Sequence, residues 1–149
     1  MLIAFYIILI GLLILADQLS KKIILEGFRF KWNWFEIILV YNEGSAFGIK
    51  LLKNNEYILV NSFILLILLI FTLFKARNNK FANYYYTSFS FIAAGGIGNL
   101  IDRIIHGKVV DFIAVYHFPV FNLADSFITI GSSLLILIML IDKQSKTGK

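Results

Sequence analysis

Long runs rich in hydrophobic residues dominate the chain. Four of them lie at about residues 1–20, 57–74, 83–104 and 121–141. Each is close to the roughly 20 residues that a helix needs to cross a hydrocarbon core of about 30 Å. Because backbone groups in lipid have no water to bond, each run is expected to form a helix. The pattern therefore predicts an all-α membrane protein with four transmembrane helices, in a single domain that covers residues 1–149.

The first hydrophobic run has two interpretations, a cleaved signal peptide or a retained membrane anchor. A signal peptide carries Lys or Arg before its apolar core and a small-x-small cleavage site after it. Neither feature is present around residues 1–20. We therefore expect this helix to remain in the protein as an anchor.

The composition agrees with a membrane protein. Hydrophobic residues make up 59% of the chain and charged residues 15%, and the mean hydropathy is +0.81. A soluble domain is nearer half apolar and a quarter charged, so the excess is expected to face lipid. The net charge of +5 lies mostly between or beyond the apolar runs, where basic residues contact headgroups or fix topology. No basic stripe interleaved with aromatics indicates a nucleic-acid partner. The lack of cysteine excludes disulfides and a thiol nucleophile.

The segment between the first two runs is predicted to form a small extracytoplasmic β-sheet, a cradle at about residues 24–50. Residues 28–34 alternate apolar and polar side chains with a period of two. That period is typical of a strand with one face buried or against lipid headgroups. Residues 37–41 form a second β-prone run. The alternative is an interfacial aromatic belt without a part in catalysis.

Polar residues gather near the ends of the first, third and fourth runs that lie on one side of the membrane. Such residues are costly at membrane depth, so their clustering indicates a site. Asp17 and Lys21 are four residues apart, acid first, which favours a helical ion pair with a structural role. Asn42 and Gly44 lie among small residues, a pattern typical of a tight turn. By itself that pattern also fits a simple loop.

The third run combines small residues with a polar end. Residues 93–98 are small or apolar, and close helix packing is sufficient to explain them. Asn99 and Arg103 share one helical face, Asp102 adjoins Arg103, and Gly107 is placed to cap the helix. Asn99 and Arg103 offer donors for a peptide carbonyl or a carboxylate. The alternative is that Arg103 only snorkels to the interface.

Two acids frame the start of the fourth run. Asp111 lies between apolar pairs, an environment that raises a carboxyl pKa by desolvation. Asn122 fits an N-cap, which places Asp125 at the third helical position. Each acid also has a simpler interpretation, Asp125 as a helix cap and Asp111 as an isolated loop acid. Together they fit a pair that shares one proton, as in an aspartic peptidase, which needs no cofactor.

Other chemistries lack their residue patterns. No paired metal-ligand motif is present, and His106 and His117 lack suitable partners in the sequence. Serine-hydrolase motifs and phosphate-binding loops are absent as well. The remaining alternative is a small channel, carrier or accessory subunit that uses the acids as proton or cation ligands. No internal repeat supports that alternative.

The motifs in this order resemble the lipoprotein signal peptidase, or signal peptidase II, family over nearly the whole chain. Two positions depart slightly from it, because Ser45 and Gly96 stand where the family often has alanine. The matching elements are Asp17-Gln-x-Ser-Lys21, Asn42-x-Gly-x-Ala-Phe-Gly48, Gly95-x-x-Gly-Asn-x-x-Asp-Arg103, Val109-Val-Asp-Phe-Ile113 and Phe121-Asn-x-Ala-Asp-Ser126.

The resemblance implies a monomeric aspartic endopeptidase of the bacterial cytoplasmic membrane, without cofactor or metal. Its partners would be membrane lipids and lipidated prolipoproteins, cleaved just before the cysteine that carries diacylglycerol. Asp111 and Asp125 would be the catalytic pair. Residues that bind substrate or support the pair would be Asn42, Gly44, Asn99, Arg103, Asn122 and Ala124. Structural support would come from Asp17, Lys21 and Asp102. The strands would form the cradle, and residues 51–57 a short interfacial helix.

Charge asymmetry predicts the topology. The connector at residues 75–80 holds three basic residues and no acid, and the tail after residue 141 holds three lysines and one acid. The opposite side carries eight of the nine acids. Both termini should therefore be cytoplasmic, with Asp111 and Asp125 toward the extracytoplasmic face. A reporter that works only in the cytoplasm should be active when it is fused to the C-terminus. If instead only a reporter that works outside the cytoplasm is active, the predicted topology is wrong.

Overall fold

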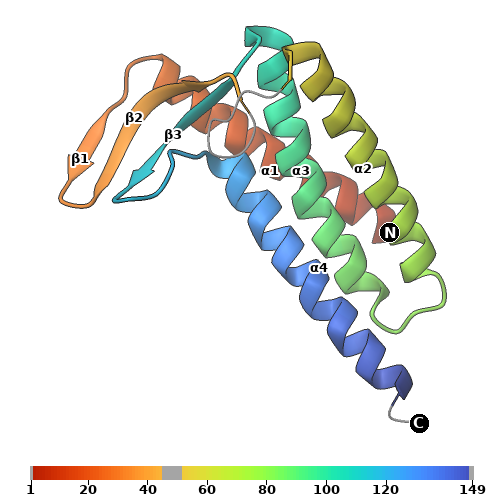
Figure 1. Cartoon of the computed structure of the whole chain (residues 1–149). Coiled ribbons are helices and arrows are strands. Elements are labelled where there is room, and N and C mark those ends of the chain that lie inside the picture. The colour runs from red at the N-terminus through yellow and green to blue at the C-terminus, as the bar shows by residue number, and fades with distance from the viewer. Residues whose placement is uncertain (1, 45–51, 148–149) are drawn as a thin grey trace.

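The structure, a computed structural model, describes residues 2–44 and 52–147. Within these ranges the helices lie side by side and a small sheet adjoins one end of them (Figure 1). The elements in chain order are α1 (Leu2–Leu25), β1 (Phe30–Trp32), β2 (Phe35–Asn42), α2 (Asn54–Ala76), α3 (Ala82–His106), β3 (Val109–Val115) and α4 (Leu123–Thr147).

Three helices of the described chain are long and apolar enough to cross a membrane, Ile3–Leu25, Asn54–Ala76 and Leu123–Ser145. They correspond to the first, second and fourth predicted spans. The remaining helix, α3, has 25 residues but contains buried polar residues such as Ser88, Ser90 and Asp102. Its composition therefore does not by itself establish the third predicted span, at residues 83–104.

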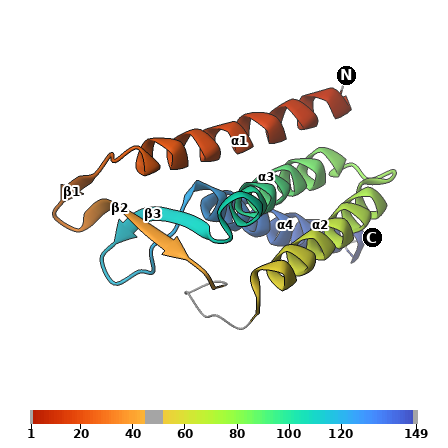
Figure 2. The same cartoon turned by 90° about the horizontal axis from the view of Figure 1, so that it is seen from above.

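Helix α3 occupies the centre of the bundle. It packs against α1, α2 and α4, and it lies between α1 and α2 in the view from above (Figure 2). Its glycines allow this contact. A Cβ atom on Gly95 would lie 2.2 Å from the carbonyl oxygen of Ala124 on α4. A Cβ atom on Gly98 would lie 2.6 Å from Oδ2 of Asp17 on α1. The predicted role of these small residues in close helix packing is therefore confirmed.

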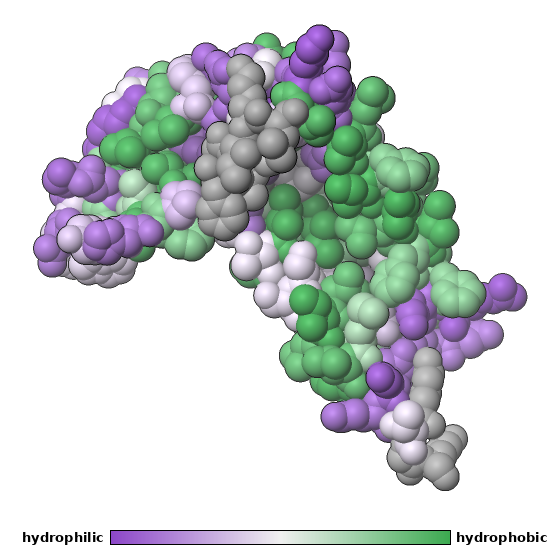
Figure 3. Space-filling model, in the orientation of Figure 1, coloured by the Kyte–Doolittle hydropathy of each residue, from purple (hydrophilic) through white to green (hydrophobic). Residues whose placement is uncertain are grey.

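The outer surface of the bundle is strongly apolar. Hydrophobic residues cover the visible sides of the helices, and hydrophilic residues gather near the sheet and at the opposite end (Figure 3). Large side chains such as Phe63 and Phe74 on α2 are 63% and 76% exposed. In water such a surface would drive association, whereas in a bilayer it meets lipid tails.

The sheet differs from its prediction in two ways. It has three antiparallel strands in the order β1-β2-β3, and the third strand, β3, contains Asp111, so the alternative of an isolated loop acid is wrong. The first predicted strand, at residues 28–34, is present as β1 over Phe30–Trp32, and all three of its residues are exposed, so no face of it is buried within the protein. The second predicted strand, at residues 37–41, lies within β2.

Two further expectations concern residues near the gap in the described chain. The predicted cradle at residues 24–50 extends into residues 45–50, which lie outside the described ranges. The expected short helix at residues 51–57 is also partly outside them. Its described part, from Asn54, is the first turn of α2. That turn is capped by Glu56, whose Oε2 accepts the Lys53 N–H at 2.7 Å.

Close packing at Gly95 gives a stability prediction. Gly95→Ala should lower the melting temperature in detergent, because the added methyl group meets the Ala124 carbonyl. Overpacking of this kind costs about 1–3 kcal/mol. Gly11→Ala is the matched control, since a Cβ atom there has nothing within 4 Å. Equal melting temperatures for Gly95→Ala and the unmodified protein would contradict the packing described above.

Candidate active site

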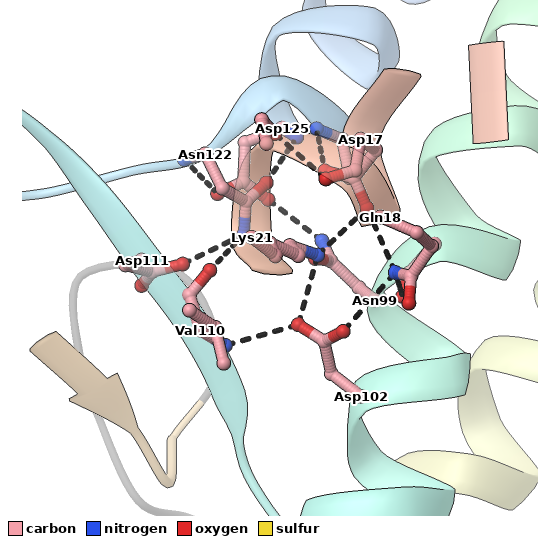
Figure 4. Close-up of polar contacts among 12 residues, drawn as sticks. Asp17, Gln18, Lys21, Asn99, Asp102, Val110, Asp111, Asn122 and Asp125 are labelled. Atoms are coloured by element: carbon pink, nitrogen blue, oxygen red, sulfur yellow. Dashed lines mark hydrogen bonds and ion pairs between the residues drawn. The ribbon is translucent and has the colours of Figure 1, made fainter. Parts of the chain in front are cut away.

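The two candidate acids come together where β3 and α4 meet. Phe121, just before α4, bonds back onto β3. Its N–H donates to the Ile113 carbonyl at 3.1 Å, and the Ile113 N–H donates to its carbonyl at 2.7 Å. This bridge returns the chain to the sheet, so the first turn of α4 lies beside Asp111 (Figure 4).

Asn122 connects the two acids. As predicted, it caps α4, because its Oδ1 accepts the Asp125 N–H at 2.9 Å. Asp125 completes the cap by accepting the Asn122 N–H on Oδ2 at 3.2 Å. The Asn122 Nδ2 also donates to Oδ1 of Asp111 at 2.7 Å. One fully buried residue thus contacts both carboxyl groups, that of Asp111 through its side-chain amide and that of Asp125 through its backbone N–H.

Each carboxyl group also accepts a hydrogen bond from the side-chain amide of a further asparagine. Asn42 on β2 donates its Nδ2 to Oδ2 of Asp111 at 2.9 Å. Asn99 on α3 donates its Nδ2 to Oδ1 of Asp125 at 2.8 Å. Amide side chains from three different elements therefore hold the two acids in place.

A buried ion network lies behind these amides. The Lys21 Nζ is 2.8 Å from Oδ2 of Asp17 and 2.8 Å from Oδ2 of Asp102, and all three side chains are at most 3% exposed. The predicted Asp17–Lys21 ion pair is confirmed, and Asp102 joins it across helices. Lys21 also donates to Oδ1 of Asn99 at 3.2 Å. That bond orients the Asn99 amide so that its NH₂ group faces Asp125 (Figure 4).

The same network holds the backbone next to each acid. Oδ1 of Asp17 accepts the Ala124 N–H at 2.9 Å, one residue before Asp125. Oδ2 of Asp102 accepts the Val110 N–H at 3.0 Å, one residue before Asp111. The ion network thus sets the positions from which both acids project.

Burial changes the chemistry of Asp111. Loss of solvent raises the pKa of its carboxyl group from the ordinary 3.8 to about 6. The hydrogen bonds from Asn42 and Asn122 oppose this rise in pKa, and the nearby charge of Asp125 adds to it. Asp111 can therefore hold a proton close to neutral pH, as a general acid requires.

A cavity of about 710 Å³ opens in front of the acids. Its polar lining includes the predicted residues Asn42, Gly44, Asn99, Arg103, Asp111 and Asp125. The predicted residues Asn122 and Ala124 lie behind this wall and are fully buried. Among the described residues, no group of three or more His, Asp or Glu side chains is arranged to hold a metal ion.

Arg103 is built into the cavity wall. Its guanidinium group lies 4.4 Å from the ring centroid of Tyr57, and its Nη2 donates to the Gly44 carbonyl. Its Nη1 is buried without a partner in the described part of the chain. At 8% exposure the side chain does not snorkel to the interface, so that alternative is wrong.

Sequence reasoning missed three polar residues. Tyr57, Asn61 and Thr129 line the cavity, yet none belongs to a motif singled out in the sequence. Asn61 carried a usable signal, because an amide inside the apolar run at residues 57–74 needs a polar partner. Gln18 on α1 was also not assigned, although its Nε2 donates to Oδ1 of Asp102 at 3.1 Å.

An apolar helical bundle that holds two acids beside a cavity defines a membrane-embedded enzyme, and solved structures agree. The structure of one bacterial membrane enzyme aligns with 99% of this chain, and the alignment covers 94% of the enzyme's chain. The TM-score is 0.84 and the sequence identity 32%. A second matches 93% of this chain and 94% of its own, with a TM-score of 0.80 and 32% identity.

A family model described as signal peptidase (SPase) II matches residues 9–141. The chain belongs to the signal peptidase II family, a family of peptidases, which argues against the channel alternative. It is 35% identical to the lipoprotein signal peptidase of Staphylococcus haemolyticus, over 94% of this chain and 92% of that protein. It is 38% identical to the lipoprotein signal peptidase of Burkholderia cenocepacia, over 84% of this chain and 81% of that protein.

The raised pKa of Asp111 gives a prediction for stability against pH. Above pH 6 the folded protein must hold a buried charged carboxylate, which the unfolded chain carries more easily. Asp111 therefore lowers stability increasingly as pH rises from 3.8 to about 6. The melting temperature of Asp111→Asn minus that of the unmodified protein should therefore increase over this pH range and then level off. The full rise corresponds to about 3 kcal/mol at most.

The control for that measurement is Glu26→Gln, because the Glu26 side chain is 64% exposed. Its melting temperature relative to the unmodified protein should change little over the same pH range. A difference for Asp111→Asn that is equally flat would mean that Asp111 has an ordinary pKa in the folded protein.

Proposed function

We propose that the protein is a membrane aspartic endopeptidase that removes signal peptides from diacylglyceryl-modified prolipoproteins, cleaving on the N-terminal side of the lipidated cysteine. Membership of the signal peptidase II family supports this function. The observation that carries it is the pair Asp111 and Asp125, joined through Asn122 beside an apolar cavity.

The chemistry follows from one proton shared by two neighbouring acids. We assign this proton to Asp111, whose pKa of about 6 allows it to be held. Asp125 takes a proton from water as the water oxygen attacks the scissile carbonyl carbon. Asp111 gives its proton to the carbonyl oxygen, which forms a tetrahedral diol. Collapse of the diol breaks the C–N bond as Asp125 gives its proton to the leaving nitrogen. Asp111 takes a proton from a diol hydroxyl group, so the new carboxyl group forms and both acids return to their starting states.

The other predicted residues receive supporting roles. Arg103 and Asn99 position the substrate backbone, and the Nη1 of Arg103, which has no partner among the described residues, supports this role. Asn42 and Asn122 hold the Asp111 carboxyl group. The remaining predicted residues have an indirect role, because they hold these groups in position. They are Gly44, Ala124, Asp17, Lys21 and Asp102. No cofactor enters the reaction.

The site also has a proposed place in the cell. The chain is a single, monomeric domain of the bacterial cytoplasmic membrane with both termini in the cytoplasm. Helix α3 also crosses the membrane, which brings the number of transmembrane helices to four. Its position among α1, α2 and α4 supports this role. The sheet lies at the extracytoplasmic surface, where exposed Trp32 and Trp34 contact lipid headgroups.

The catalytic assignment predicts the effect of removing either acid. Asp111→Asn and Asp125→Asn should each lower cleavage of a lipidated peptide by about 10³-fold or more. Asn keeps the shape but exchanges no proton with water or the carbonyl. Because the acids act as a unit, the double variant should be little worse than either single one. Turnover by purified protein in detergent is the measurement.

Asp142→Asn is the matched control, since Asp142 is a buried acid outside the cavity. It should retain turnover, and melting curves for all variants would separate lost chemistry from lost folding. Substantial turnover by Asp125→Asn at an unchanged melting temperature would reduce Asp125 to a helix cap. The shared-proton mechanism would then be wrong.

A further inference from the structure

One amide of the cavity has no part in the mechanism above. Asn61 lies in α2, whose mean hydropathy reaches 2.6 over its most apolar window, and it lines the cavity. A polar side chain in such a helix is costly unless it meets a partner. Both its NH₂ group and its oxygen are therefore expected to have hydrogen-bond partners.

Only one end of the Asn61 amide is bonded within the described residues. Its Nδ2 donates to the Gly96 carbonyl of α3 at 3.0 Å. Its Oδ1 accepts no hydrogen bond from the described part of the chain. This oxygen would lie 3.3 Å from a Cβ atom on Gly96, a position that the Leu65 side chain also approaches, and both Asn61 and Gly96 line the cavity. The bond to α3 fixes the amide at the cavity wall, with an oxygen that no donor of the described residues occupies.

Asn61 lies deeper in the bundle than the two acids. Gly96 precedes Asn99 by three residues on α3, or about 4.5 Å along the helix axis. Asn99 is the residue that bonds Asp125. An extended peptide advances about 3.3 Å per residue, so this depth corresponds to one or two substrate residues.

The substrate supplies a matching donor. If the proposed function holds, the signal peptide rises through the membrane and reaches the acids at its C-terminal end. Its last residues must be extended to expose the scissile bond, which leaves backbone N–H groups without helical partners. Unbonded N–H groups are costly away from water. The neighbouring cavity residues Val60, Ile64 and Ile128 offer no side-chain acceptor.

We infer that Oδ1 of Asn61 accepts a backbone N–H of the signal peptide, one or two residues before the scissile bond. Asn61 is then a substrate-binding residue that keeps the end of the signal peptide extended. This role rests on the proposed function and adds a contact on the membrane side of the acids.

The test combines a protein variant with a change in the substrate backbone. The substrate is a fluorogenic peptide whose cysteine carries diacylglycerol. In its analogues, an ester replaces one amide at a time before the scissile bond, which removes the N–H donor and weakens the carbonyl as an acceptor. Asn61→Leu and the ester at the contacted position should each raise KM about three- to tenfold, as expected for one neutral hydrogen bond. Combined, they should raise KM no further, while kcat changes little.

Ser62→Leu is the matched control, since Ser62 adjoins Asn61 but is exposed and does not line the cavity. It should leave KM unchanged, and melting curves should confirm that Asn61→Leu folds. An unchanged KM for Asn61→Leu would overturn the inference. So would ester effects that are equally large in Asn61→Leu and the unmodified protein. Both outcomes require an active enzyme, whereas failure of the unmodified protein to cleave the parent peptide would also reject the proposed function.

Discussion

The buried ammonium group of Lys21 is the interaction on which the site depends. It lies between the carboxylates of Asp17 and Asp102, and all three side chains are nearly inaccessible to solvent. Desolvation makes such a network costly, and its worth depends on satisfying every remaining polar atom. Here Oδ1 of Asp17 accepts the Ala124 N–H, and Oδ2 of Asp102, which also meets Lys21, accepts the Val110 N–H. Four elements, α1, α3, β3 and α4, are therefore joined at one point.

This network contributes geometry that an apolar core would not. Hydrophobic side chains of similar volume can replace a buried ion pair without loss of stability. They would not orient the Asn99 amide toward Asp125, as Lys21 does. The network also explains the small residues around it. Gly98 leaves room for the Asp17 carboxylate, because a Cβ atom there would lie 2.6 Å from Oδ2. That atom would also lie 3.3 Å from the Cβ of Ala124.

Local features of the structure were predictable from the sequence, and long-range ones were not. The Asp17–Lys21 pair and the Asn122 cap each involve residues within one helical turn, so spacing alone indicates them. Strand β3 depends on pairing with β2, from which it is separated by α2 and α3. A short apolar run such as Val109–Val115 does not reveal that pairing. The contact of Asp102 with Lys21 and the cavity position of Asn61 are likewise set by helix packing.

Helix α3 shows how a helix at the centre of a bundle can carry many polar residues. A lipid-facing helix must present apolar side chains around much of its surface, whereas a helix surrounded by others can place polar groups against them. Asn99, Asp102 and Arg103 all have partners on neighbouring elements. In the proposed enzyme this central position has a chemical purpose. It brings donors to the acids at the end of the bundle, where water is available for hydrolysis.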